Sequence, residues 1–163
     1  MTHFGDRLIE ASRRCKTPLC MGIDPHPGMI PKLFGDASAP AGSDAAIRAI
    51  DDFAMACVEQ AMGRVAAIKP QAAFFEQQGP AGMKILQNLG QAAVDADLLV
   101  IMDAKRGDIG STSGAYAAGW IGHNAQFPSD ALTINPWLGI ETLAPFLKRA
   151  DETGSGLFIL NRT

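Results

Sequence analysis

Short apolar runs alternate with longer amphipathic stretches along this chain of 163 residues. The runs are rich in Val, Ile, Leu and Ala and are followed by turn-forming or polar residues, a pattern typical of strands buried on both faces of a sheet. We therefore predict five strands, at residues 19–23, 65–68, 98–102, 131–134 and 156–160.

Helices are predicted between these runs, where apolar residues recur every three or four positions. The clearest case follows Ser43 and Asp44, either of which is suited to cap the start of a helix. Its apolar face comprises Ile47, Ile50, Phe53, Ala54, Cys57, Val58 and Ala61. Similar spacing predicts helices near residues 4–9, 81–96, 113–124 and 143–147, whereas a Pro- and Gly-rich loop occupies residues 24–42.

The alternation of strand and helix predicts an α/β fold with a parallel sheet and right-handed crossovers. No Gly-x-Gly-x-x-Gly fingerprint follows the first strand, which argues against a dinucleotide-binding fold. The strands instead end in polar residues, as in a (β/α)8 TIM barrel, whose active site lies at the carboxyl ends of its strands. These residues are Asp24, Lys69, Asp103, Asn135 and Asn161. Because five of the eight strands of such a barrel are predicted, we expect residues 1–163 to form a single domain, the N-terminal part of a TIM barrel.

The end of the third predicted strand carries the strongest chemical signal. The run Leu98–Met102 leads directly into Asp-Ala-Lys-Arg-Gly-Asp, residues 103–108. Residues two apart on an extended backbone point the same way, so Asp103 and Lys105 are expected to project together. Such charges are costly to desolvate unless they pair. The alternative is a solvated surface loop that turns at Gly107.

Composition narrows the functional classes. The chain is 47% hydrophobic and 19% charged, with a net charge of −3, which is ordinary for a globular protein. Mild acidity without a basic cluster argues against nucleic-acid binding, and no apolar window is long enough to cross a membrane. The amino terminus lacks an apolar signal region, and three scattered cysteines predict no disulfide framework, so a cytoplasmic location is expected. Three dispersed histidines predict no zinc site.

Four blocks in order resemble the orotidine 5′-phosphate decarboxylase family. Residues 103–112, with Asp-x-Lys-x-x-Asp followed by Ile-x-x-Thr, match its signature. Gly22–Pro27, Ile68–Glu76 and Asn135–Gly139 look like the bacterial branch, which has a long first loop. The likeness extends from about Phe4 to the end of the chain and corresponds to the N-terminal part of a family member.

The resemblance implies decarboxylation of orotidine 5′-phosphate to uridine 5′-phosphate in de novo pyrimidine synthesis, without cofactor or metal. It also implies a TIM barrel and a homodimer with shared active sites. Asp24 and Lys69 match positions that hold the ribose hydroxyls, and Thr112 matches a residue that reaches across the dimer interface. The matching catalytic tetrad is Lys69, Asp103, Lys105 and Asp108, of which Asp108 would come from the partner subunit.

The chemistry is consistent with these residue types. Loss of carbon dioxide from a vinylic carbon leaves a poorly delocalised carbanion, which a fixed cation can stabilise and then protonate. Lys105 fits the role of proton donor. Asp103 would keep Lys105 protonated and repel the substrate carboxylate until carbon dioxide leaves.

Other interpretations remain open at this point. A magnesium-dependent sugar-phosphate lyase or synthase is the rival enzyme, although Lys69 favours the metal-free decarboxylase. A catalytically inactive fragment is the other alternative, since the family's phosphate-gripping segments lie beyond this sequence. Structural roles are also possible for Lys69 as a strand terminator, Asp24 as a turn residue and Thr112 as a helix cap. Trp120 and Trp137 are expected to serve packing.

Overall fold

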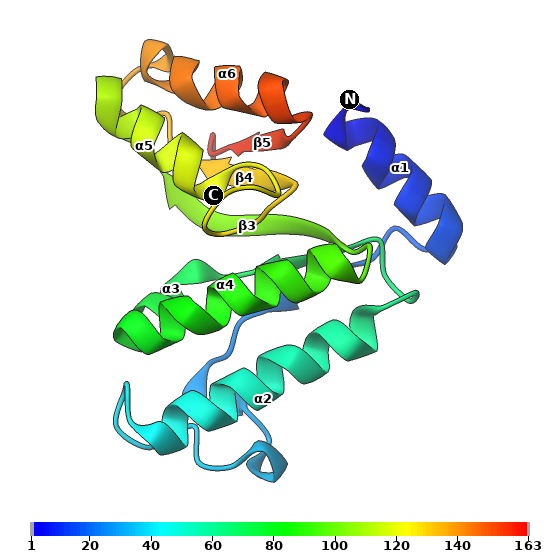
Figure 1. Ribbon diagram of the computed structural model, residues 1–163, viewed down its shortest axis with the longest axis vertical. Coiled ribbons are helices and arrows are strands. Elements are labelled where there is room, and N and C mark those ends of the chain that lie inside the picture. Colours follow the sequence, from blue (N-terminus) through cyan, green and yellow to red (C-terminus); the bar gives the residue numbers. More distant parts are fainter. Residues whose placement is uncertain (1, 163) are drawn as a thin grey trace.

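The computed structural model describes residues 2–162 and contains one parallel sheet (Figure 1). Its five strands are adjacent in chain order, and every neighbouring pair is parallel. The strands are β1 (Cys20–Ile23), β2 (Ala67–Pro70), β3 (Leu99–Arg106), β4 (Ala131–Ile134) and β5 (Gly156–Ile159). The predicted α/β class with a parallel sheet is therefore confirmed.

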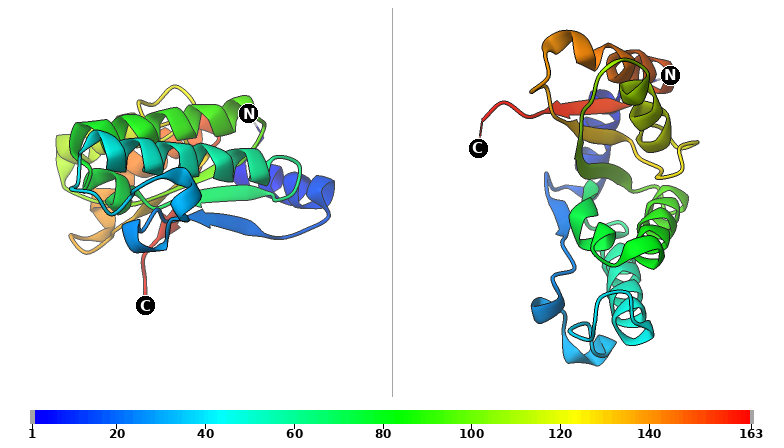
Figure 2. Two further views of the ribbon diagram at one scale, coloured as in Figure 1. Left: turned by 90° about the horizontal axis from the view of Figure 1, so that it is seen from below. Right: turned by 90° about the vertical axis from the view of Figure 1, so that its left-hand side faces the viewer.

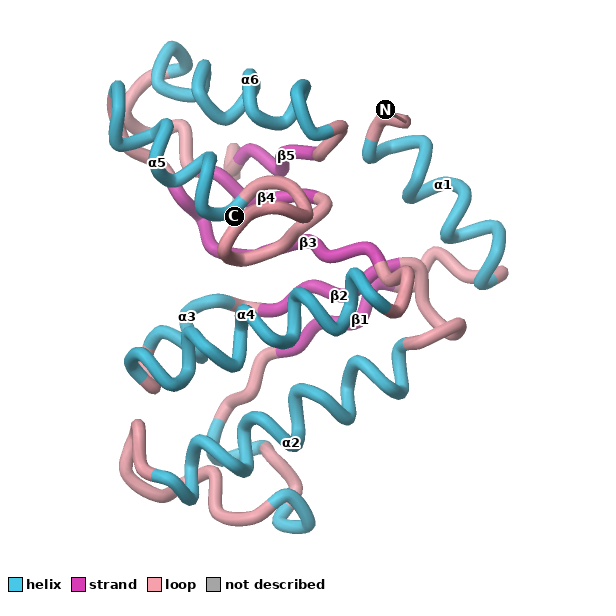
Figure 3. The backbone as a smooth tube through the Cα atoms, in the orientation of Figure 1, coloured by secondary structure: helices cyan, strands magenta, loops and turns pink. Residues whose placement is uncertain are grey.

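Helices connect the strands and cover one face of the sheet (Figures 2 and 3). They are α2 (Asp44–Ala61), α3 (Ala72–Glu76), α4 (Gly79–Asp95), α5 (Gly110–Trp120) and α6 (Ala144–Thr153). Short 3-10 helices lie at η1 (Pro27–Met29), η2 (Lys32–Phe34) and η3 (Ile140–Leu143). The predicted cap of α2 is confirmed, because the Ser43 side chain accepts a hydrogen bond from the Ala46 backbone N–H.

The two faces of the sheet are packed differently. Ile68, Met102 and Leu132 point toward the helices and belong to the main apolar core. The opposite face carries smaller residues at the same strands, and α1 (Phe4–Cys15) lies on it near the strand starts through Phe4. Phe4 approaches Gly156 so closely that a Cβ there would lie 2.3 Å from its ring. Larger residues are therefore excluded from this position of β5.

Side-chain alternation places the polar strand ends on this second face. Lys69, Asp103 and Thr133 follow Ala67, Ile101 and Ala131 by two residues and therefore share their face. They lie at the carboxyl ends of three adjacent strands. Of the predicted polar residues, Lys69 and Asp103 thus converge at one edge of the sheet.

The strand ends differ from the sequence-based prediction. β3 continues to Arg106, four residues beyond Met102, with a register shift against β4 in between. β2 continues through Lys69 and Pro70 because these residues pair with Gly22 and Ile23 of β1. A short helix, α3, follows β2 and was not predicted, because its five residues are too few to show an apolar periodicity.

The two tryptophans have different environments. Trp120 is 5% exposed and serves packing as predicted, whereas the prediction for Trp137 is wrong because its side chain is 88% exposed. Within residues 2–162 no helix is both long and apolar enough to cross a membrane.

Candidate active site

Asp103 is the centre of a hydrogen-bonded cluster at the carboxyl ends of β2, β3 and β4. Its Oδ2 accepts hydrogen bonds from Lys69 Nζ at 2.7 Å and Gln71 Nε2 at 3.1 Å. Its Oδ1 accepts from Lys105 Nζ at 2.5 Å and Thr133 Oγ1 at 3.0 Å. The carboxylate is therefore held on both oxygens, with an ammonium group on each. The prediction that Asp103 and Lys105 project together is confirmed.

The backbone at Lys105 departs from a regular strand. Lys105 has a φ of 50°, in the left-handed region, and lies within the irregular register between Met102 and Arg106. Its N–H donates to Thr133 Oγ1 at 2.9 Å rather than to a backbone carbonyl. Thr133 thus accepts from the Lys105 backbone and donates to Asp103, which ties the bulge to β4.

The electrostatic balance keeps Asp103 ionised. Burial by itself would raise the pKa of this carboxyl, since it disfavours the charged form. Hydrogen bonds from Lys105, Lys69 and Thr133, together with the charge of Lys69, outweigh burial and lower the pKa below its usual value. The two lysine side chains are 35% and 46% exposed, so their ammonium groups border solvent. A carboxylate fixed between accessible cations can hold Lys105 as a charged proton donor.

Three other predicted site residues lie apart from this cluster within one chain. Asp108 lies beyond β3, and its Oδ1 accepts from the adjacent Ile109 N–H at 2.8 Å. Thr112 is exposed in the first turn of α5 and is not its cap, since Ile109 holds that position. Asp24 is exposed just after β1, next to the end of β2, where Gln71 N–H donates to Ile23 O.

Sequence reasoning missed two members of the cluster, Gln71 and Thr133. Gln71 lies in a bridge with Asp103 and directs its amide to the same carboxylate. Both residues share the face of Lys69 or Ala131 by alternation, which is the signal that identifies them once strand register is known. Their neutral side chains complete the carboxylate's hydrogen bonds without adding charge.

The edge that carries the cluster is also hollowed. A cavity of about 440 Å³ lies at the carboxyl ends of β4 and β5, lined by Asn135, Trp137 and Leu160 among others. Among residues 2–162 no group of three or more His, Cys, Asp or Glu side chains is arranged to hold a metal ion. The charged side chains of the cluster at this edge are two lysines and one aspartate, so the cluster is cationic.

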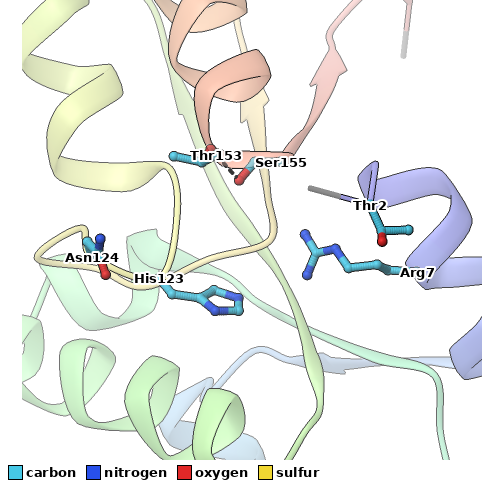
Figure 4. A pocket seen from close by; sticks show the side chains of 6 residues that line it. All are labelled: Thr2, Arg7, His123, Asn124, Thr153 and Ser155. Carbon is cyan, nitrogen blue, oxygen red and sulfur yellow. Dashed lines mark hydrogen bonds between the residues drawn. The ribbon is translucent and has the colours of Figure 1, made fainter.

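A second polar cavity lies at the other end of the strands (Figure 4). It measures about 350 Å³ and is bordered by Arg7, His123 and Ser155 among others. Asp130, which precedes β4, is buried behind it and accepts from Arg7, from His123 Nε2 at 2.8 Å and from Val100 N–H at 2.8 Å. Because α1 contributes Arg7, these bonds fasten α1 to the strand starts.

Comparison with known proteins gives this geometry a context. The family model for orotidine 5′-phosphate decarboxylase / HUMPS matches residues 17–163. The orotidine 5′-phosphate decarboxylase of Streptomyces coelicolor is 43% identical over 163 residues, which cover 100% of this chain and 55% of the relative. That of Corynebacterium glutamicum strain R is 38% identical over 160 residues, which cover 98% of this chain and 54% of the relative.

Solved structures agree with the sequence comparison. A structure from Streptomyces avermitilis matches with a TM-score of 0.84 and 41% identity, covering 98% of this chain and 53% of that one. The Leishmania donovani OMP decarboxylase matches with a TM-score of 0.72 and 34% identity, covering 99% and 54%. The chain thus spans about half the length of these proteins, and its sheet is the corresponding part of their TIM barrel. By the match over residues 17–163, the chain belongs to the orotidine 5′-phosphate decarboxylase / HUMPS family.

Proposed function

We propose that this chain supplies the decarboxylating residues of a carboxy-lyase that converts orotidine 5′-phosphate to uridine 5′-phosphate in pyrimidine synthesis. The observation that carries the proposal is Asp103 held between Lys69 and Lys105 at the carboxyl ends of adjacent strands. The family description also covers HUMPS. The Streptomyces coelicolor, Corynebacterium glutamicum and Leishmania donovani proteins, however, are named as orotidine 5′-phosphate decarboxylases. The magnesium-dependent alternative is not favoured.

The proposed reaction breaks the bond between the pyrimidine ring carbon and the carboxylate, and the electron pair stays on that carbon. Lys105 Nζ, fixed by Asp103 Oδ1, stabilises the developing negative charge and donates the proton that replaces carbon dioxide. Asp103 lies where it would repel the substrate carboxylate, a repulsion relieved when carbon dioxide leaves. No metal or cofactor takes part in this scheme.

We also propose that the active form is a homodimer in which Asp108 serves the site of the partner subunit. In support, Asp108 makes no hydrogen bond to Lys69, Asp103 or Lys105 within the described chain, and its neighbour Ile109 is 60% exposed. Thr112 is exposed on the next turn, in position to reach a second subunit. Asp24, at the end of β1 beside β2, and Lys69 are proposed to bind the ribose hydroxyls. A cytoplasmic location and a single domain over residues 1–163 complete the proposal.

The proposal is tested with a chimera in which this chain is followed by the part of the Streptomyces coelicolor relative that lies beyond the matched segment. Loss of orotidine 5′-phosphate absorbance is followed for the chimera, with and without EDTA, and for the 163-residue chain alone. We expect turnover by the chimera that EDTA does not change. A folded, dimeric chimera without turnover would contradict the proposed function, and loss of turnover in EDTA would favour the magnesium-dependent chemistry.

A further inference from the structure

Lys105 adopts a backbone conformation that its position in a strand does not explain. The other non-glycine residues with positive φ in the described chain, Lys16 and Asp97, follow the ends of helices, where such conformations are common. A side chain in the left-handed region costs roughly 1–2 kcal/mol. Because this bend accompanies the placement of Lys105 Nζ on Asp103, neighbouring groups have to maintain it.

β4 holds one side of the bend through the backbone. Lys105 N–H donates to Thr133 Oγ1, and Asn135 N–H donates to Arg106 O at 2.8 Å. Gly107 then passes so close to Asn135 that a Cβ would lie 2.4 Å from its carbonyl oxygen. These contacts hold β3 against β4, but they do not attach the end of β3 to the helices that cover the sheet.

Arg106 provides the attachment on the helical side. Its Nη2 forms an ion pair with Glu76 at the end of α3. Its guanidinium carbon lies 4.4 Å from the centroid of the Trp120 ring on α5, and Trp120 itself stacks on Phe127 at 4.3 Å. Figure 1 shows α3 and α5 on either side of the carboxyl end of β3. Arg106 therefore joins the catalytic strand end to two separate helices.

The guanidinium has few other restraints. Its Nε is buried and has no hydrogen-bond partner within residues 2–162, so its position is determined by the ion pair with Glu76 and by two rings of α5, Trp120 and Tyr116, the latter with its centroid 5.7 Å from the guanidinium carbon. A guanidinium can pair with a carboxylate and stack on a ring at the same time, whereas a lysine ammonium lacks the planar face for stacking. The site is therefore matched to arginine rather than to positive charge alone.

We propose that Arg106 is a positioning residue for decarboxylation: by anchoring the end of β3 to α3 and α5, it maintains the bend at Lys105 that places Nζ beside Asp103. The inference rests on the proposed function. Arg106 acts through Lys105 and does not itself touch the reacting atoms. Its loss is expected to misplace the proton donor, and a displacement of about 1 Å can cost about 100-fold in rate.

The first test measures steady-state kinetics of the chimera. We expect R106Q to lower kcat about 100-fold, and R106K and E76Q to lower it about tenfold, because each conservative change removes one of the two anchors. KM is expected to stay within about threefold, since the groups proposed to bind substrate are unchanged. R14Q is the matched control, because the Arg14 ion pair with Asp97 is exposed and belongs to α1. It should leave kcat unchanged.

A second readout does not depend on activity. The rate of Lys105 acetylation by acetic anhydride, measured by mass spectrometry, is expected to rise severalfold in R106Q and in E76Q but not in R14Q, because Lys105 no longer rests on Asp103. Failure of the wild-type chimera to decarboxylate would count against the proposed function, while the acetylation rates still decide the role of Arg106. Unchanged kcat and unchanged acetylation in a folded R106Q or E76Q variant would overturn the inference, and a lower Tm alone would show a merely structural role.

Discussion

Two buried aspartates lie at opposite ends of the same parallel strands, and they are held in different ways. Asp130, at the amino ends, is 1% exposed and is bound by an arginine, a histidine and a backbone N–H. Asp103, at the carboxyl ends, is 7% exposed and is bound by two lysines, an amide and a hydroxyl. Both carboxylates are satisfied, but the partners of Asp103 are side chains alone.

This difference indicates a structural role for Asp130 and a chemical role for Asp103. The backbone bond from Val100 and the rigid guanidinium of Arg7 hold Asp130 as a fixed joint between α1 and the strand starts. Lysine ammonium groups on flexible chains at the solvent border can contact a substrate and can also donate a proton, which a guanidinium does not readily do. We therefore expect the carboxyl end of the sheet, where TIM barrels have their active sites, to carry the chemistry and the amino end to contribute stability.

The largest expected effect is the loss of turnover in K105A. General acid catalysis contributes about 100-fold to 10,000-fold, so kcat of the chimera should fall by about 1,000-fold or more. Affinity for uridine 5′-phosphate should change by less than about threefold, because a proton donor acts chiefly in the transition state. Single-turnover decarboxylation and product titration are measured on the same protein, with K84A, an exposed lysine on α4, as the control. Retention of more than a tenth of the rate, a barrier change below about 1.4 kcal/mol, would contradict the role of Lys105.

The next test substitutes each of the two aspartates and compares the effects on stability and on turnover. D130A leaves Arg7 without its buried carboxylate partner and Val100 without an acceptor, and should lower the free energy of unfolding by about 3–5 kcal/mol. D103N should lower it by less than about 1 kcal/mol, since both lysine partners are partly solvated, yet it should abolish turnover. Urea unfolding and kcat of the two chimeric variants are compared. Equal losses of stability in the two variants, or a folded D130A without activity, would contradict the assignment of a structural role to Asp130 and a chemical role to Asp103.

Much of this contrast follows from sequence pattern, and part of it does not. Strand alternation predicts that the side chains of Asp103 and Lys105 project together, and their hydrogen bond confirms that they meet, although Lys105 is in the left-handed region rather than extended. The bend at Lys105, the amide of Gln71 and the hydroxyl of Thr133 depend on register between strands about 30 residues apart, which periodicity within one segment does not encode. Asp130 and Arg7 are separated by 123 residues, so their pairing depends on where α1 packs.

The proposed sharing of the active site between subunits is tested by mixing two inactive variants. Mixing inactive K105A with inactive D108A chimeras should restore about a quarter of wild-type activity, because random exchange makes half of the dimers mixed and each mixed dimer carries one intact site. Activity is measured after subunit exchange has been verified by native mass spectrometry. Mixing K105A with D103A serves as the control, since both lesions lie in one cluster and no intact site results if Asp108 comes from the partner. No recovery in the first mixture would place Asp108 outside the shared site.

The smallest expected effect is the pH dependence that Asp103 contributes to stability. Its folded-state pKa is lowered by Lys105, Lys69 and Thr133 in spite of burial, whereas an unfolded aspartate titrates near pH 3.9. The stabilisation by its ionised form is therefore present above about pH 4 and is lost as the pH falls through the lower folded pKa. The difference in unfolding free energy between wild type and D103N should shrink as the pH falls below about 4. D151N, on the exposed side of α6, controls for the general loss of one carboxylate. A difference that grows on acidification would mean that burial dominates at Asp103, and the carboxyl-end cluster would then resemble a strained pair rather than a carboxylate held ionised for catalysis.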